Sequence, residues 1–336
     1  MFDIICVPLV ALLSEPYIRG LCGALPELTT SFGILFVFLT FSYFQDTYSI
    51  LIDSIPVFLG FLGSFFVPES PYWLLQRGKE EEARKSIARV VGPTRKGKQE
   101  ELFLEIKARY ETIETSSKIK KLSLKEQVLL LRLPQYWKPI MLSIAIFGFR
   151  EFGGNNILFF YAITIFKETD IEVDIFISTI IVSVARVLST FLSASIQDKF
   201  GRRKLLIGTL VISALCLIFS GCVLFFEVKV LKVLPLIGIT VFILMTGIGM
   251  GPIPFIIIGE IMPSDIKFLG TAIVYSLFNL YQFLIVNVTP SILRQFSVGT
   301  IFISFSIFNF IIAGILYFIL PETKRKTFSE IESMFK

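Results

Sequence analysis

Long apolar segments alternate with shorter polar ones along most of the chain. A helix needs about 20 apolar residues to cross a bilayer, and eight segments reach that length, at 23–45, 48–67, 139–166, 175–197, 204–226, 235–259, 269–290 and 298–320. The apolar start at 1–14 is too short to cross and is typical of the end of a further helix. Because every backbone polar group inside a bilayer must be paired within the protein, this pattern predicts an all-α membrane protein with about eight transmembrane helices.

The polar stretch at 68–138 interrupts this succession and divides the chain into segments 1–67, 68–138, 139–320 and 321–336. Within it, Glu80 precedes Arg84 by four residues and Glu81 precedes Lys85 by four, a spacing that favours an exposed helix. Two more helices are predicted around 99–115 and 123–131. The alternative interpretation of this stretch is a solvated linker.

Basic residues collect on one side of the predicted membrane. They lie in 68–138, in the loops 198–204 and 261–268, and in the tail after residue 320, whereas the acidic link at 167–174 falls on the opposite side. Cytoplasmic loops carry the excess of Lys and Arg. We therefore expect the basic loops and the tail in the cytoplasm.

The segment GIGMGPIPFIIIGEIMP, at 247–263, interrupts a predicted span. It contains Gly249, Gly251, Pro252 and Pro254, and proline removes a helix hydrogen bond. Discontinuous membrane helices tend to line the substrate sites of transporters. The segment predicts a helix break beside a solute pathway, and the alternative is a kink that is only structural.

Composition excludes several classes of function. The 336 residues are 54% hydrophobic, with a mean hydropathy of +0.75, which excludes an ordinary soluble domain. The net charge of +5 is spread between apolar spans, so no nucleic-acid partner is expected. The chain has no histidine, and its four cysteines lie in or beside apolar segments without metal-binding spacing. We expect no metal, no cofactor and no catalytic site, and therefore not an enzyme.

Five motifs occur in an order that resembles the sugar porters of the major facilitator superfamily. They are PESPYWLL (68–75), FGGNN (152–156), DKFGRRK (198–204), the 247–263 segment and PETKRKT (321–327). Within that family, the chain is most similar to insect facilitated trehalose transporters. The resemblance implies that 1–67 is a remnant of the N-terminal transmembrane half, without the first four family helices. It also implies that 68–138 is a cytoplasmic helical linker, 139–320 the C-terminal six-helix half and 321–336 a cytoplasmic tail.

The resemblance also implies a set of sugar-binding positions, most of which are changed here. Asn156 and Asn279 match the family, and Phe255 stands where the family has tryptophan. Charged residues occupy four positions at which the family has glutamine or asparagine, namely Glu27, Arg150, Glu151 and Arg186. Charges within a membrane are costly and usually pair while facing a cavity. Our hypothesis is that these four form a neutral cluster that offers acceptors to a polyol.

Two alternatives stay open for the charged positions. In one, the planar guanidinium groups of Arg150 and Arg186 bind a carboxylate or phosphate on a modified solute. In the other, the site has decayed. A further set of charged residues, by the resemblance, forms ion pairs between the cytoplasmic helix ends that break as the transporter opens inward: Arg19, Glu69, Asp198, Arg202, Arg203, Glu260, Lys267 and Glu322. The alternative interpretation of DKFGRRK is an anchor of positive charge only.

The resemblance thus predicts facilitated transport of a sugar, trehalose or glucose, by alternating access in the plasma membrane. The expected partners are the sugar and the lipid bilayer, and nothing in the sequence indicates an oligomeric state. Proton coupling is not expected, because the family's coupling acid belongs to the absent first helix. The alternative is a protein that does not transport, such as a truncated paralogue, a sensor or an incomplete gene model.

Overall fold

The computed structural model describes residues 19–44, 46–69, 71–92, 97, 99–104, 106–108, 129–168, 173–226, 233–263, 266–322, 330 and 334–335. Over these residues the regular structure is helical, and they contain no strand. The chain forms two compact units, one of residues 1–45 with 127–336 and the other of residues 46–126.

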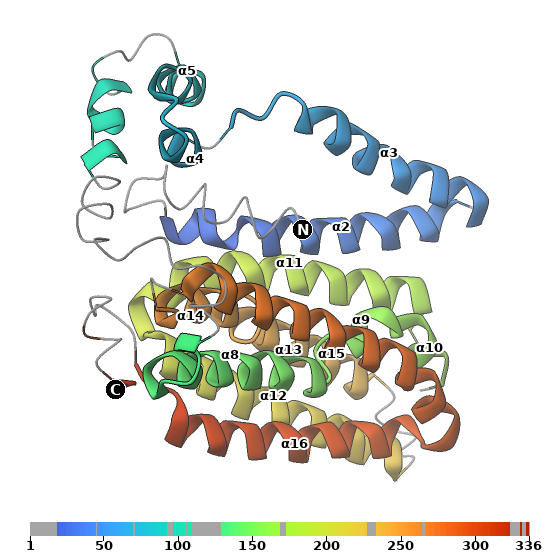
Figure 1. Ribbon diagram of the computed structural model, residues 1–336. Coiled ribbons are helices and arrows are strands. Elements are labelled where there is room, and N and C mark those ends of the chain that lie inside the picture. Colours follow the sequence, from blue (N-terminus) through green and yellow to red (C-terminus); the bar gives the residue numbers. More distant parts are fainter. Residues whose placement is uncertain are drawn as a thin grey trace. The chain divides into compact units, whose positions relative to one another are not determined.

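The larger unit contains all the candidate functional residues except Glu69, and most of the apolar helices (Figure 1). Its helices are α2 (Arg19–Tyr43), α8 (Pro134–Phe152), α9 (Ile157–Phe160), α10 (Ala162–Glu168), α11 (Ile175–Phe200), α12 (Arg202–Phe225), α13 (Leu234–Ile248), α14 (Ile253–Ile261), α15 (Lys267–Gln295) and α16 (Val298–Ile319). Helix α2 runs along α11, where Phe32 meets Phe191 edge to face at 6.2 Å between ring centroids (Figure 1).

Six stretches of the described chain are long and apolar enough to cross a membrane. They are Thr47–Ser64, Ile175–Gln197, Arg202–Phe225, Leu234–Ile261, Leu269–Gln295 and Val298–Ile319. Two predicted spans fall outside this group. The apolar part of α2, Glu27–Tyr43, is shorter, and the predicted span 139–166 is divided among α8, α9 and α10. The predicted helix at 1–14 lies outside the described residues.

Two helices are interrupted, and at each interruption a side chain from a neighbouring helix hydrogen bonds to a backbone carbonyl that the helix leaves unpaired. At the first interruption, between α8 and α9, Asn309 Nδ2 donates to the Gly153 carbonyl at 2.9 Å. At the second, between α13 and α14, Ser193 Oγ donates to the Ile248 carbonyl at 2.7 Å. Inside a bilayer an unpaired backbone group costs several kcal/mol, so these bonds make both interruptions tolerable. The second interruption spans residues 249–252, where the sequence predicted a break.

Small residues bring α12 and α16 close together. A Cβ atom on Gly221 would lie 3.0 Å from the Gly299 carbonyl, and one on Gly299 would lie 3.0 Å from the Gly221 carbonyl. Ser306 Oγ also donates to the Ala214 carbonyl at 2.7 Å. Such contacts between backbones are the usual means of helix association in membranes, where water provides no hydrophobic driving force.

The smaller unit contains α3 (Asp46–Ser64), α4 (Pro71–Gln76) and α5 (Glu80–Val91). Helix α5 is present as predicted, but its charged residues pair differently from the i,i+4 pattern. Arg84 binds Glu100 and lies over the Phe103 ring, and Lys107 binds Glu80 at 2.8 Å. Residues 99–104 and 106–108 are helical and supply these contacts, and the rest of the second predicted helix lies outside the described residues.

Candidate solute-binding site

Helices α2, α8 and α11 bring charged side chains together inside the larger unit. We name as the charged cluster Glu27 of α2, Arg150 and Glu151 of α8 and Arg186 of α11, together with Asn155 and Asn156 of the turn that follows α8. Arg150, Glu151, Asn155 and Arg186 are each 5% exposed or less. The four charged residues come from three separate helices, so only the folded bundle assembles them.

Glu27 lies between the two arginines. Its Oε1 atom accepts a hydrogen bond from Arg186 Nη2, and it is 3.7 Å from Arg150 Nη2. Arg186 Nη1 also donates to Asn155 Oδ1 at 3.3 Å. These contacts join α2 to α8 and α11 through ion pairs within the bundle.

Glu151 has a different environment from Glu27. Both of its carboxylate oxygens accept from Asn156 Nδ2, at 3.0 and 2.8 Å. Both residues were predicted as site residues, and the structure places them in contact. The amide is a neutral donor, and in the described part of the chain Glu151 has no ion pair within 4.0 Å.

Arg150 is the least satisfied member of the charged cluster. Its Nε and Nη1 atoms have no hydrogen-bond acceptor among the described residues, although the side chain is only 5% exposed. Its guanidinium carbon lies 4.9 Å from the ring centroid of Phe255 and 5.4 Å from that of Phe278. Cation–π contacts of this length are attractive, but they leave the N–H groups of the guanidinium without acceptors.

The interrupted helix α13–α14 contacts the charged cluster through glycines. A Cβ atom on Gly251 would lie 3.3 Å from Glu27 Oε1. One on Gly247 would lie 1.9 Å from Ser189 Oγ and 3.5 Å from the Arg186 side chain. The absence of side chains at these two positions therefore lets the backbone of the interruption approach the ion pair.

Four aromatic rings pack together, and two of them, Phe255 and Phe278, lie beside Arg150. Phe147 of α8 is 5.1 Å from Phe255 of α14 and 5.0 Å from Phe278 of α15, centroid to centroid. Phe255 stacks on Tyr275 at 6.0 Å, and we name Phe147, Phe255, Tyr275 and Phe278 the aromatic group. Sugars bind proteins through polar groups placed beside apolar and aromatic walls. The charged cluster and the aromatic group together provide both kinds of surface.

Asn279 is separate from the charged cluster in its described contacts. It is exposed, and its Nδ2 atom donates to the Tyr275 carbonyl one turn earlier at 2.7 Å. Among the described contacts, its link to the site is therefore through the backbone of Tyr275 of the aromatic group.

The structure brings together part of the predicted cytoplasmic ion-pair set. Arg202 Nη2 is 3.2 Å from Glu260 Oε1, and the Arg202 backbone N–H donates to Glu322 Oε1 at 3.2 Å. Arg203 donates to the Tyr317 carbonyl. Glu69 belongs to the smaller unit, where its carbonyl accepts from Ser86 Oγ. The side chains of Arg19, Asp198 and Lys267 lie outside the described residues.

Sequence reasoning missed several residues that shape the site. Asn155 binds Arg186, and Asn309 supports the interruption after α8. Phe278 and Tyr275 complete the aromatic group. A polar asparagine within the apolar run 298–320 was a signal for Asn309, since polar residues in membrane helices often hydrogen bond to a neighbouring helix.

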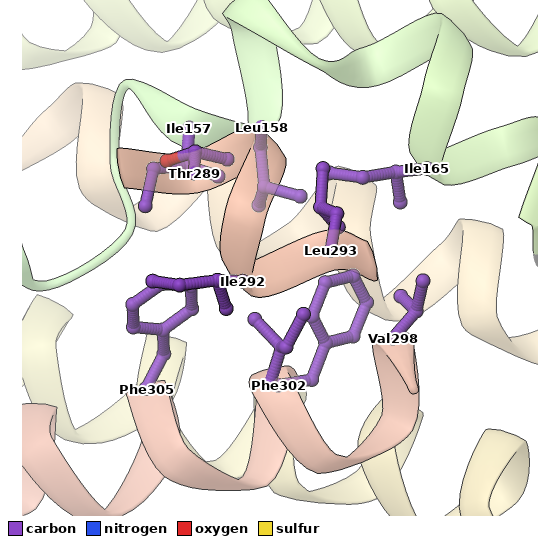
Figure 2. Close-up of a pocket in the computed structure, with 10 residues that line it drawn as sticks. Ile157, Leu158, Ile165, Thr289, Ile292, Leu293, Val298, Phe302 and Phe305 are labelled. Atoms are coloured by element: carbon purple, nitrogen blue, oxygen red, sulfur yellow. The ribbon is translucent and has the colours of Figure 1, made fainter. Parts of the chain in front are cut away.

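A separate apolar pocket lies near the end of α15 and the start of α16 (Figure 2). Its volume is about 10 Å³, and Thr289 is the polar residue of its lining: Ile157, Leu158, Ile165, Thr289, Ile292, Leu293, Val298, Ile301, Phe302 and Phe305. A volume of this size holds about one water molecule, so the pocket is too small for a sugar. Across the described residues, no group of three His, Cys, Asp or Glu side chains is placed to hold a metal ion.

The fold and the buried charged cluster are those of a multi-pass helical membrane protein with a polar interior. The family model described as "Sugar (and other) transporter" matches residues 2–335, and the chain belongs to this family.

Curated relatives include the facilitated trehalose transporter Tret1 of Apis mellifera ligustica, 32% identical over 331 residues, and that of Drosophila yakuba, 29% identical over 327 residues. These matches cover 96% and 95% of this chain. The chain spans only 63% of the length of the first relative and 37% of the second.

Solved structures of the xylose transporter XylE share the fold. The proton:xylose symporter XylE bound to 6-bromo-6-deoxy-D-glucose superposes with a TM-score of 0.74 at 23% identity, covering 99% of this chain and 71% of that one. An inward-open form of XylE from E. coli gives a TM-score of 0.72 at 21% identity, covering 98% of this chain and 69% of that one. The major-facilitator fold expected from the sequence is therefore confirmed.

Proposed function

We propose that this protein carries out facilitated transport of a sugar, trehalose or glucose, down its gradient by alternating access. The chain belongs to a sugar-transporter family. The observation that carries the proposal is its charged cluster, which is buried between α2, α8 and α11 and beside the interrupted helix α13–α14. Polar groups within such helices usually face a solute pathway. The relatives from Apis mellifera ligustica and Drosophila yakuba are facilitated trehalose transporters, which supports trehalose as one solute to test.

The proposed membrane arrangement follows the charge pattern of the sequence. It has about eight crossings, with 139–320 as the six-helix half, and with 68–138 and 321–336 in the cytoplasm. In addition to the six long apolar stretches, α2 and the divided α8–α10 segment supply the other two crossings. The plasma membrane is the proposed location.

Within the proposed site, each residue has a role that its chemistry supports. Glu27 and Glu151 supply acceptors for sugar hydroxyls, Asn156 supplies both a donor and an acceptor, and Phe255 supplies an aromatic wall. Arg150 and Arg186 hold the carboxylates in place and donate to the solute. Asn279 acts at the edge of the aromatic group. The interruption at Gly249, Gly251, Pro252 and Pro254 allows α13 and α14 to move as separate segments.

The cytoplasmic contacts of Arg202 are proposed to hold one of the two alternating states. The Arg202 and Glu260 side chains are 17% and 24% exposed. Ion pairs in such partly exposed positions contribute only about 0–1 kcal/mol each, so a rocking motion can break and remake them. Arg19, Glu69, Asp198, Arg203, Lys267 and Glu322 are proposed as members of the same set.

The experiment is uptake of labelled trehalose and glucose by the purified chain in liposomes, with insertion checked in the same preparation. We expect saturable uptake that unlabelled sugar inhibits. The variant Asn156→Ala removes the contact to Glu151, and we expect it to lower kcat/KM by about 10-fold or more, as for loss of a hydrogen bond to a charged group. The matched control is Asn287→Ala on α15, an exposed asparagine whose amide bonds only to its own helix.

Two outcomes would contradict the proposal. One is no uptake of either sugar above empty liposomes by correctly inserted protein. The other is uptake that is equally lowered by Asn156→Ala and Asn287→Ala, because the effect would then not report on the site.

A further inference from the structure

Arg150 has more hydrogen-bonding capacity than the protein around it uses. A guanidinium group carries five N–H donors on three nitrogens and does not lose its charge in proteins. Only Nη2 lies near a carboxylate, at 3.7 Å from Glu27 Oε1, and Nε and Nη1 have no acceptor among the described residues. A cation that is 5% exposed and so incompletely paired is costly unless a further acceptor arrives.

The two carboxylates of the charged cluster are already engaged. Glu27 binds Arg186 more closely than it binds Arg150. Glu151 binds the Asn156 amide through both oxygens. Glu151 balances the total charge of the four residues, but at contact distance two arginines share the single carboxylate of Glu27. The contact group of Glu27, Arg150 and Arg186 thus has a net charge of +1, which Glu151 balances from outside ion-pair distance.

The aromatic group fixes the position of this charge. The rings of Phe255 and Phe278 both lie beside the Arg150 guanidinium, and neither ring can accept its N–H groups as a carboxylate would. Apolar walls also exclude water, which strengthens any ionic contact made there. The result is a guanidinium that is held in place and desolvated, with N–H groups on Nε and Nη1 that no described residue accepts from.

We propose that the solute carries an anionic group, a carboxylate or a phosphate, which binds Arg150. The inference adds an acidic or phosphorylated sugar to the solutes proposed above, and it rests on the proposed transport function of the same site. The hydroxyls of the sugar bind Glu151 and Asn156, while the anionic group supplies the acceptor that Glu27 does not supply.

An anion fits this position better than a neutral hydroxyl does. A hydroxyl oxygen can accept from the unpaired N–H groups of Arg150 but has no charge of its own to pair with the guanidinium. Hydrogen bonds between ionised groups are roughly twice as strong as neutral ones, and guanidinium pairs with carboxylate and phosphate in a matching planar geometry. The anion also competes with Glu27 for the arginines, so binding loosens a contact that joins α2 to α8 and α11.

The test measures ligand binding to the purified full chain in detergent, by thermal-shift titration with glucose, glucuronate and glucose 6-phosphate. We expect at least one of the two anionic sugars to bind tenfold or more tightly than glucose. Comparison of glucuronate with glucose 6-phosphate distinguishes a carboxylate site from a phosphate site. Equal or weaker binding of both anions would overturn the inference.

Variants assign the preference to Arg150. Arg150→Gln should reduce the anion-to-glucose affinity ratio to about one, and Arg150→Lys, which keeps the charge without the planar group, should give an intermediate ratio. The matched control Arg294→Gln removes a positive charge from the exposed end of α15 and should keep the parent ratio. If Arg150→Gln does not fold, Arg150→Lys still decides, because an unchanged ratio in that variant would contradict recognition by the planar guanidinium.

Glucose uptake in liposomes separates this inference from the proposed function. Saturable glucose uptake without binding or inhibition by either anion would overturn the anion site and leave transport in place. Tight anion binding without uptake of labelled glucose, labelled trehalose or the labelled anion itself would support the site and overturn transport.

Discussion

At the scale of single residues, the unusual feature is the grouping of four charged side chains inside the helical bundle. Taking a charge out of water costs several kcal/mol, and an ion pair recovers that cost only with good geometry and further hydrogen bonds. Arg186 meets this condition through Glu27 and Asn155. Arg150 meets it less well, which is why the two arginines are expected to differ in function.

Replacing Arg186 by Ala should destabilise the protein strongly. The change removes the closest ion of Glu27 and leaves that carboxylate with Arg150 at 3.7 Å. Removal of one member of a buried pair typically costs about 3–5 kcal/mol. The measurement is the unfolding free energy in detergent for Arg186→Ala, Glu27→Gln and the double variant. The double variant should lose less than the sum of the single losses, and strict additivity with small effects would show that the pair contributes little.

The sequence predicted the members of the charged cluster better than their pairing. Charges at 27, 150, 151 and 186 stood out in apolar spans, and their spacing in the family order placed them near one another. The partners Asn155 and Asn156 follow from the turn after α8, whose Gly154 has a φ of +86°. The turn depends on contacts with other helices, which no local pattern encodes. The turn in turn determines that Asn156 hydrogen bonds to Glu151 and that Asn155 hydrogen bonds to Arg186.

At the scale of elements, two interrupted helices, α8–α10 and α13–α14, contact the charged cluster. The break after α13 was predicted because two prolines and three glycines stand close together there. The break after α8 was not, because Gly153 and Gly154 within 139–166 gave a weaker local signal. The turn at this break is stabilised by two residues of α16. Asn309 hydrogen bonds to it, and the Phe305 ring lies 3.0 Å from the position that a Cβ on Gly154 would take.

Replacing Gly247 by Ala should disturb the approach of α13 to α11. The added Cβ would lie 1.9 Å from Ser189 Oγ and 2.8 Å from Ser189 Cβ. Overpacking of this kind typically costs about 1–3 kcal/mol. The measurement is thermal stability in detergent, with Gly208→Ala on α12 as the control because a Cβ there meets nothing within 4 Å. Partial recovery in Gly247→Ala with Ser189→Gly would assign the loss to this contact, and equal stability of the two alanine variants would contradict it.

Replacing Asn309 by Leu should weaken the turn after α8. The amide bonds the Gly153 carbonyl and the Phe305 carbonyl, both at 2.9 Å, and leucine keeps a similar size without the donor. Leaving a buried acceptor unsatisfied costs about 1–3 kcal/mol. The unfolding free energy of Asn309→Leu is compared with that of Asn287→Leu, whose amide bonds only to its own helix at Phe283. A loss no greater than that of the control would show that the turn does not depend on Asn309.

At the scale of the whole molecule, the pattern of charges determines the expected orientation in the membrane. The sequence predicted all-α architecture from the length of the apolar runs alone, since no other regular structure with open ends satisfies its backbone in lipid. It could not predict which apolar run would be divided among short helices, as α8–α10 are. The number of crossings therefore has to be tested by accessibility rather than counted from helix lengths.

The expected orientation places Lys204 in the cytoplasm and Arg294 outside. Three predicted crossings separate them, formed by α12, the interrupted α13–α14 and α15, and an odd number of crossings puts two residues on opposite sides. Both side chains are exposed. In a variant lacking Cys6, Cys22, Cys216 and Cys222, an impermeant maleimide added to intact cells should label Arg294→Cys. It should label Lys204→Cys only after the membrane is permeabilised.

Labelling of both positions in intact cells would contradict three crossings and would point to α13–α14 as the segment that fails to cross. Its interruption at 249–252 divides the 28 residues of Leu234–Ile261 into helices of 15 and 9 residues. Neither helix alone reaches the length of about 20 residues that spans a bilayer, so the two halves can cross only when joined end to end. The hydrogen bond from Ser193 Oγ pairs the Ile248 carbonyl at a depth where lipid offers no donor. It therefore helps the interrupted segment to cross the membrane. Opposite labelling of the two positions is thus the result expected if the interruption beside the charged cluster lies within the membrane.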